Sequence, residues 1–258
     1  MKKLEGQVAL VTGGGKGIGR AIALALAAKG VRVVITGREE KALGETIGEI
    51  AYGGGKARHL AGDVRDAAHL DAAVTRAIET FGGLDIVVAN AGVSGRVDLG
   101  DDIARAKSIL ETNLGGTYNT FHTAAPRMKG PGRLIATSSV LAKFGVPGYT
   151  AYCASKAGIL GLVRACAHEL AKKRITCNAI VPGWVETDMA EAGLREIAAA
   201  TGKTRDEVKT DAVAAFPLGR FIEPHEVAEL VLYLSSSAAD AITGQAIAIC
   251  GGATAFGG

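Results

Sequence analysis

The chain has 258 residues, of which 48% are hydrophobic and 21% charged, and its formal net charge is +3. A chain of this size can bury a large core, and we expect a single α/β domain over residues 1–258. Lysines and arginines spread along the chain, together with only 5% aromatic residues, argue against a nucleic-acid partner.

The first predicted elements are a strand, a glycine-rich turn and a helix. Val8–Thr12 is an apolar run of the β type, and residues 13–19 contain five glycines. Apolar residues then recur at helical spacing, at Ile18, Ile22 and Leu26. Glycines let backbone amides approach a ligand, and a helix N-terminus favours an anion.

The spacing of this turn is Thr-Gly-x-x-x-Gly-x-Gly, without the Gly-Lys-Ser/Thr ending of a P-loop. Kinase and ATPase functions are therefore disfavoured, and a dinucleotide is the expected ligand. The alternative is that the glycines only allow the helix to pack on the sheet. The turn predicts cofactor contacts from Gly13, Lys16, Gly17, Ile18 and Gly19.

Strands and helices keep alternating along the chain. Further strands are predicted at Val31–Thr36, Ala57–Gly62, Ile86–Ala89, Arg133–Ser138, Ile175–Val181 and Ala246–Cys250. Helical segments are predicted at Glu40–Ile50, Asp66–Phe81, Tyr152–Lys172 and Val227–Leu234. Apolar strands separated by helices are typical of a parallel sheet covered on both faces. We predict a doubly wound, seven-stranded parallel sheet, the Rossmann fold, with ligands beyond the carboxyl ends of its strands.

The end of the second predicted strand bears on cofactor choice. An NAD site usually carries an acid there for the ribose 2′-hydroxyl, whereas a 2′-phosphate needs positive charge. The tip reads Thr36-Gly37-Arg38, and Lys16 lies in the glycine turn. Two cations without an acid favour NADP(H). After the third strand, Asp63 with Val64 is placed either to contact the adenine or to cap the next helix.

The predicted chemistry lies in the second half of the chain. Tyr152 and Lys156, at i and i+4, share one face of a helix. A cation near a phenol favours the phenolate, so we expect Lys156 to lower the pKa of Tyr152 and make it a usable acid at neutral pH. Ser139, at the end of a strand, is placed to donate a hydrogen bond to a substrate oxygen.

With these motifs in this order, the sequence resembles the short-chain dehydrogenases/reductases from about Gly6 to Gly252. The resemblance implies a catalytic tetrad of Asn113, Ser139, Tyr152 and Lys156, all of which are present. Lys156 would also bind the nicotinamide ribose beside Tyr152. Further cofactor contacts are implied for Asn90, Ala91 and Gly92, and for Pro182, Gly183, Val185 and Thr187. Ala89 departs from the family's Asn-Asn-Ala-Gly element.

The resemblance implies an NADP(H)-dependent oxidoreductase, and short matches in the second half are most similar to ketoacyl and polyketide ketoreductases. We expect residues 188–220, where the alternation is interrupted, to form a substrate lid. An alcohol dehydrogenase working toward oxidation is the alternative. A dinucleotide-binding protein without catalysis is disfavoured because the tetrad is complete. The histidines form no cluster with the spacing of metal ligands, so we expect no metal site. No histidine stands at a motif spacing from Ser139, so a hydrolase triad is not supported.

Association and location are predicted from the same sequence. Neither Met1–Glu5 nor the apolar run Ala21–Ala28 suits a leader or a membrane span, so we expect a cytoplasmic protein without a membrane partner. Four cysteines without Cys-x-x-Cys spacing are expected to be reduced. The resemblance implies a homotetramer that pairs helix 152–172 and the helix after Asp101, with the last strand and residues 253–258 at a second interface.

Overall fold

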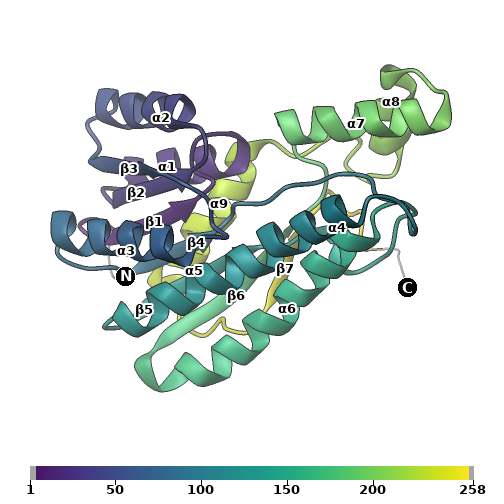
Figure 1. The fold of residues 1–258 in the computed structure, drawn as a ribbon. Helices are drawn as coiled ribbons and strands as arrows, with labels where there is room; N and C mark the ends of the chain where they lie inside the picture. The colour runs from purple at the N-terminus through teal and green to yellow at the C-terminus, as the bar shows by residue number, and fades with distance from the viewer. Residues whose placement is uncertain (1–3, 256–258) are drawn as a thin grey trace.

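The computed structural model describes residues 4–255, and within them a single parallel sheet has the strand order β3-β2-β1-β4-β5-β6-β7 (Figure 1). The predicted seven-stranded doubly wound fold is confirmed, with strand ends within one or two residues of the prediction. The strands are β1 Val8–Thr12, β2 Arg32–Gly37, β3 Ala57–Ala61, β4 Ile86–Ala89, β5 Gly132–Thr137, β6 Ile175–Pro182 and β7 Ala246–Ile249.

Helices cover both faces of the sheet (Figure 1). On one face lie α1 Gly17–Ala28, α2 Glu40–Tyr52 and α9 Pro224–Ser235. On the other face lie α3 Ala67–Phe81, α4 Ile103–Leu110, α5 Gly116–Ala124 and α6 Thr150–Leu170. The sequence had indicated a helix after Asp101, but not that it continues, through a π-helical segment at Glu111–Gly115, into α5.

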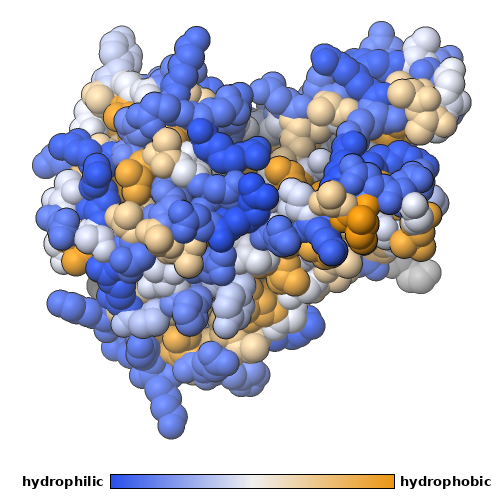
Figure 2. All heavy atoms as spheres, in the orientation of Figure 1, coloured by the Kyte–Doolittle hydropathy of each residue, from blue (hydrophilic) through white to orange (hydrophobic). Residues whose placement is uncertain are grey.

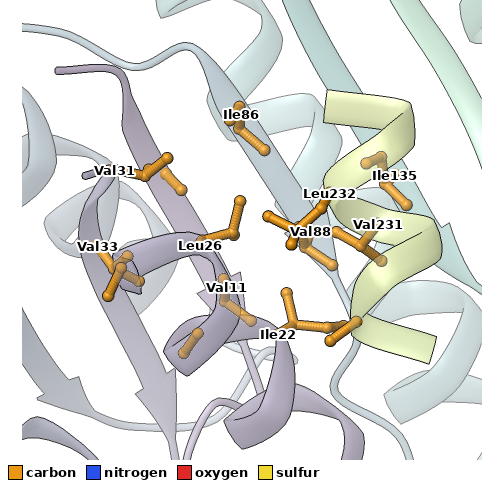
Figure 3. Close-up of a cluster of buried hydrophobic side chains, with 14 of the residues drawn as sticks. Val11, Ile22, Leu26, Val31, Val33, Ile86, Val88, Ile135, Val231 and Leu232 are labelled. Atoms are coloured by element: carbon orange, nitrogen blue, oxygen red, sulfur yellow. The ribbon is translucent and has the colours of Figure 1, made fainter. Parts of the chain in front are cut away.

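The hydrophobic core lies between the sheet and its two helical layers. Ile22 and Leu26 of α1 are completely buried against the sheet and against Val231 of α9 (Figure 3). Burial of one such side chain stabilises the fold by about 1.5–3 kcal/mol. A second cluster joins α3, α5 and α6 to the other face. The apolar spacing that predicted α1 therefore also fixes which side of the helix meets the sheet.

Two helices, α7 Asp188–Thr201 and α8 Arg205–Ala214, extend beyond the sheet above α4 (Figure 1). They bury a small cluster of their own with the segment that follows, in which Leu194, Val208, Phe216 and Phe221 are buried. This pair corresponds to the segment that was expected to form a lid.

Several sequence predictions concern the ends of the chain and its surroundings. Residues 1–3 and 256–258, which include part of the N-terminal stretch and of the glycine-rich tail expected at a subunit interface, lie outside the described residues. Among residues 4–255, no helix is both long enough and apolar enough to cross a bilayer.

The order of the strands in the sheet reverses at β1, because β2 and β3 lie on one side of it and β4 to β7 on the other. The connections leaving β1 and β4 therefore run to opposite faces, and a crevice opens between them at the carboxyl ends of the strands. The glycine turn after β1 and the loops after β4, β5 and β6 all end at this edge.

Candidate active site

In the glycine turn, the backbone of residues 13 and 14 lies directly against the end of β2. Gly13 and Gly14 both donate to the carbonyl oxygen of Thr36, at 2.7 and 3.1 Å, which ties the turn to β2. Gly13 and Gly17 have φ values of +69° and +50°, a region that favours glycine. A Cβ on Gly19 would overlap the carbonyl oxygen of Gly13. Gly19 thus supports the turn from behind instead of lining the crevice.

The N-terminus of α1 faces the crevice. Lys16 is its N-cap residue. Among the described residues, no side chain forms a capping hydrogen bond there, and the first turn of α1 contains no acidic residue. The first amides of a helix carry partial positive charge and have no partner inside the helix. They are therefore available to an anionic ligand.

The crevice holds two connected hollows. One, of about 190 Å³, lies between the glycine turn and the ends of β2 and β3. The other, of about 890 Å³, runs along the ends of β4, β5 and β6 to α7. They share a wall that includes Gly13, Lys16, Arg38, Ala91 and Gly92. The hollows together are lined by all the residues expected at the site except Gly19 and Asn113, including Gly17, Ile18, Asp63, Val64, Asn90, Ser139, Tyr152, Lys156, Pro182, Gly183, Val185 and Thr187.

An acid that the sequence analysis had passed over lies at the smaller hollow. Glu39, directly after Arg38, pairs with Lys16 at 2.6 Å between Nζ and Oε2. The expectation of two cations without an acid is therefore wrong for this end of the site. Arg38 is exposed and has no ion pair among the described residues.

Asp63 does not have one of the two roles expected for it, that of capping the helix that follows. It does not cap α3, because Asp66 does so by accepting from the amide of Ala68 at 2.8 Å. The carboxylate of Asp63 instead accepts from the backbone amide of Arg65 at 2.9 Å and from its guanidinium at 3.1 and 2.7 Å. This arginine holds the pKa of Asp63 below its usual range. An adenine would have to share the carboxylate with Arg65.

Ser139, Tyr152 and Lys156 converge at the larger hollow. Ser139 is buried just beyond β5, where its Oγ accepts from the amide of Leu141 at 3.2 Å. Lys156 is 4% exposed, and its Nζ donates to the carbonyl oxygen of Thr137 at 2.9 Å. The same Nζ lies 5.6 Å from the centre of the Tyr152 ring. Strand β5 therefore anchors both the serine and the lysine beside the phenol.

The pKa of Tyr152 moves in the opposite direction from the expectation. Tyr152 is partly buried at the wall of the hollow, and desolvation raises the pKa of its phenol to about 12, although the nearby Ser139 hydroxyl acts to lower it. Burial also lowers the pKa of Lys156 to about 8. At neutral pH the phenol is protonated and the lysine carries its charge. Tyr152 is thus in the state of a proton donor.

Asn113 is completely buried in the π-helical segment and does not line the hollow. Its Nδ2 donates to the carbonyl oxygen of Val93 at 2.9 Å and to Ser155 at 3.0 Å, and its Oδ1 accepts from the amide of Val93 at 2.8 Å. A Cβ on Gly92 would meet Asn113 Oδ1 at 3.1 Å and Lys156 Nζ at 3.4 Å. Asn113 therefore holds the loop after β4 close to Lys156.

The loop after β6 joins the crevice to α7. Thr187 donates to the carbonyl oxygen of Val185 at 3.1 Å and accepts from the amide of Ala190 at 3.3 Å, so it is the N-cap of α7. A Cβ on Gly17 would lie 3.1 Å from the methyl group of Thr187. The loop expected to hold a nicotinamide therefore touches the turn expected to hold a pyrophosphate.

Aromatic residues also line the larger hollow, and among them Trp184 has both of the roles that the sequence left open, lining the pocket and packing behind the loop. Phe144 and Tyr149 line it, and Trp184 both lines it and stacks on Phe221, with 5.4 Å between ring centres. Tyr149 is 6% exposed, and its hydroxyl has no hydrogen-bond partner among the described residues. Tyr149 is three residues before Tyr152, a spacing that would have placed both near one face of a helix.

Comparisons with known proteins agree with this geometry. The sequence family described as enoyl-(acyl carrier protein) reductase matches residues 13–254. The monensin polyketide synthase putative ketoacyl reductase of Streptomyces virginiae is 39% identical over 259 residues, with 98% of each chain covered. The 3-oxoacyl-[acyl-carrier-protein] reductase FabG of Staphylococcus aureus strain Mu50 is 37% identical over 253 residues, which cover 95% of this chain and 96% of that protein.

Solved structures show the same likeness. A variant of actinorhodin polyketide ketoreductase with NADPH superposes with a TM-score of 0.94 at 35% identity, covering 99% of this chain and 100% of the other. Levodione reductase superposes with a TM-score of 0.93 at 28% identity, covering 98% and 99%. The fold thus has counterparts in a polyketide ketoreductase and in levodione reductase.

Proposed function

The chain belongs to the short-chain dehydrogenase/reductase family, and we propose that it reduces a ketone with NADPH, with 3-oxoacyl thioesters as the substrate class. The observation that carries the proposal is the convergence of Ser139, Tyr152 and Lys156 at one cavity beside the dinucleotide crevice. The names of the relatives support the substrate class.

The residues of the crevice fit a dinucleotide. The amides at the start of α1 suit a pyrophosphate, and the small residues Gly13, Ala91 and Gly92 leave the wall open to it. Arg38 and Lys16 would face the adenosine end, and Val185 and Thr187 the nicotinamide end. When bound, the reduced nicotinamide supplies a hydride to the carbonyl carbon.

The chain's own residues hold the carbonyl oxygen and supply its proton. Ser139 would donate a hydrogen bond to that oxygen, and the Tyr152 hydroxyl would transfer its proton to it. The charge on Lys156 would then stabilise the phenolate that remains. Asn113 positions the loop of Gly92 and Lys156 from behind.

The relatives favour reduction over the alternative, alcohol oxidation, because they are named as reductases. In that direction Tyr152 would act as the acid, and a phenol with a raised pKa retains the proton to be donated. The family description also suggests reduction of a carbon–carbon double bond, but a serine and a tyrosine that line one cavity suit a carbonyl oxygen, which can accept a hydrogen bond from each.

The test is a direct assay of cofactor oxidation. We expect purified protein to oxidise NADPH with a 3-oxoacyl thioester, and to do so with a higher kcat/KM than with NADH. The loss of reduced-nicotinamide absorbance measures both. The matched 2-enoyl thioester should give no turnover, and turnover of that compound alone would contradict the proposal. Failure of 3-oxoacyl thioesters, cyclic ketones and diketones alike would also reject it.

The rate of reduction should depend on pH through Lys156. Since burial lowers the pKa of Lys156 to about 8, the lysine is charged below that pH and neutral above it. The loss of charge removes the cation that stabilises the phenolate, so kcat should be constant below about pH 7 and fall as the pH passes about 8. In Lys156→Arg, which stays charged, the fall near pH 8 should disappear whatever the absolute rate. A wild-type profile that is flat to about pH 10 would exclude this role.

The helices α7 and α8 are proposed as the substrate lid. Glu196 of α7 accepts from the Arg105 guanidinium of α4 at 2.6 Å and from the amide of Arg96 at 3.0 Å, which ties α7 to α4 and to the loop after β4. Limited proteolysis with and without NADPH and product tests whether this segment becomes protected.

A cytoplasmic homotetramer is also proposed, with α4, α5 and α6 at a subunit contact. Hydrophobic residues are exposed over part of this face (Figure 2). Leu110 of α4 and Tyr118 of α5 are exposed. Light scattering at the working concentration tests the tetramer, which a monomer would contradict.

A further inference from the structure

The ion pair between Lys16 and Glu39 stands where two helices begin. Lys16 is the N-cap residue of α1 and Glu39 the N-cap residue of α2, and both side chains line both hollows of the crevice. Their charged atoms are 2.6 Å apart, and each side chain is more than half exposed. The Glu39 carboxylate is thus an anion held at the place where the proposed cofactor would bring its 2′-phosphate.

We propose that Glu39 is a cofactor-specificity residue, because its carboxylate holds Lys16 and must release it before a 2′-phosphate can bind there. This inference rests on the proposed use of NADPH. The same carboxylate is able to accept a hydrogen bond from a ribose 2′-hydroxyl, the group that NADH offers in place of the phosphate. Glu39 therefore disfavours NADPH and favours NADH, against the combined effect of Lys16 and Arg38.

The charges around the pair show why the competition is close. Lys16 lowers the pKa of Glu39, and Arg38 adds to the effect, so the acid is ionised at neutral pH. Glu39 in turn raises the pKa of Lys16. An exposed ion pair is weak, so a phosphate with two negative charges can displace it at a cost of up to about fivefold in affinity. Arg38 is exposed, and its charge acts on both Glu39 and Asp63.

The neighbouring acid, Glu40, provides a matched control. Glu40 lies one residue further along α2 and pairs with His59 at 2.7 Å, and it lines neither hollow. Replacing either acid by glutamine removes the same charge from the same helix terminus. Any difference between the two variants therefore reports on the contact with Lys16 instead of on net charge.

The experiment compares Glu39→Gln with Glu40→Gln by titration calorimetry with NADPH, NADH, adenosine 2′,5′-bisphosphate and adenosine 5′-monophosphate. We expect Glu39→Gln to bind NADPH and the bisphosphate about fivefold more tightly, and NADH and the monophosphate no more tightly. Glu40→Gln should change each Kd by less than about twofold. Adding Lys16→Met to Glu39→Gln should abolish most of the gain.

The outcomes separate this inference from the proposed function. An unchanged ratio of NADPH to NADH affinity in Glu39→Gln, or an equal gain in Glu40→Gln, would overturn the inference even if ketones are reduced with NADPH. A selective gain for the bisphosphate would support it even if no ketone is reduced, since the bisphosphate reports binding without turnover.

Discussion

Replacing Tyr152 by phenylalanine is expected to lower kcat for ketone reduction by about 10³-fold, within the range of positioned proton transfer. The substitution removes only the hydroxyl of a residue that lines the larger hollow together with Ser139. The ring remains and the cofactor contacts of the glycine turn are distant, so the Kd for NADPH should stay within about twofold. Single-turnover kinetics and NADPH titration measure the two effects separately.

A second phenol in the same cavity is the control. Tyr149 lines the hollow, and its ring centre is 6.5 Å from that of Tyr152. Its hydroxyl has no partner among the described residues, so Tyr149→Phe should lose less than about fivefold in kcat. If Tyr152→Phe retained a tenth or more of the wild-type turnover, another group would have to donate the proton.

Replacing Gly19 by alanine is expected to abolish tight NADPH binding and to destabilise the fold by about 1–3 kcal/mol. The added methyl group would overlap the carbonyl oxygen of Gly13 and crowd the side-chain amide nitrogen of Asn90. The carbonyl oxygen of Gly13 belongs to the backbone and cannot rotate away as a flexible side chain would, so the glycine turn must open to make room for the methyl group. Thermal unfolding should show Tm lowered by several degrees, about 2–4 °C for each kcal/mol in a chain of this size.

Gly44 offers the opposite case in a neighbouring helix. It is exposed in the interior of α2, and a Cβ there would meet nothing within 4 Å. Gly44→Ala should therefore raise stability by up to about 1 kcal/mol, because alanine favours the helix and loses less entropy on folding. Gly19→Ala with wild-type Tm and NADPH affinity would show that the turn is not constrained as described.

The fold could be predicted because its signals are local. The apolar runs at Val8–Thr12 and Ile86–Ala89 are buried along their whole length, as strands of a covered parallel sheet must be. The π-helical segment around Asn113 has no such local apolar pattern. The Asn113 side chain bonds to Val93 and Ser155, which are 20 and 42 residues away in the sequence.

The site was predicted in composition better than in electrostatics. The spacing of Tyr152 and Lys156 indicated their proximity, but not that burial would raise the pKa of the first and lower that of the second. The burial of these two side chains depends on elements that are distant from them in the sequence. Glu39 was missed for a related reason, because only the structure shows that its side chain turns back toward Lys16.

Thr187 connects the glycine turn to helix α7. One side of this residue abuts the turn at Gly17, and its hydroxyl fastens the first turn of α7. Any movement of Thr187 when a nucleotide binds at the glycine turn would therefore pass directly to α7, without involving the rest of the sheet.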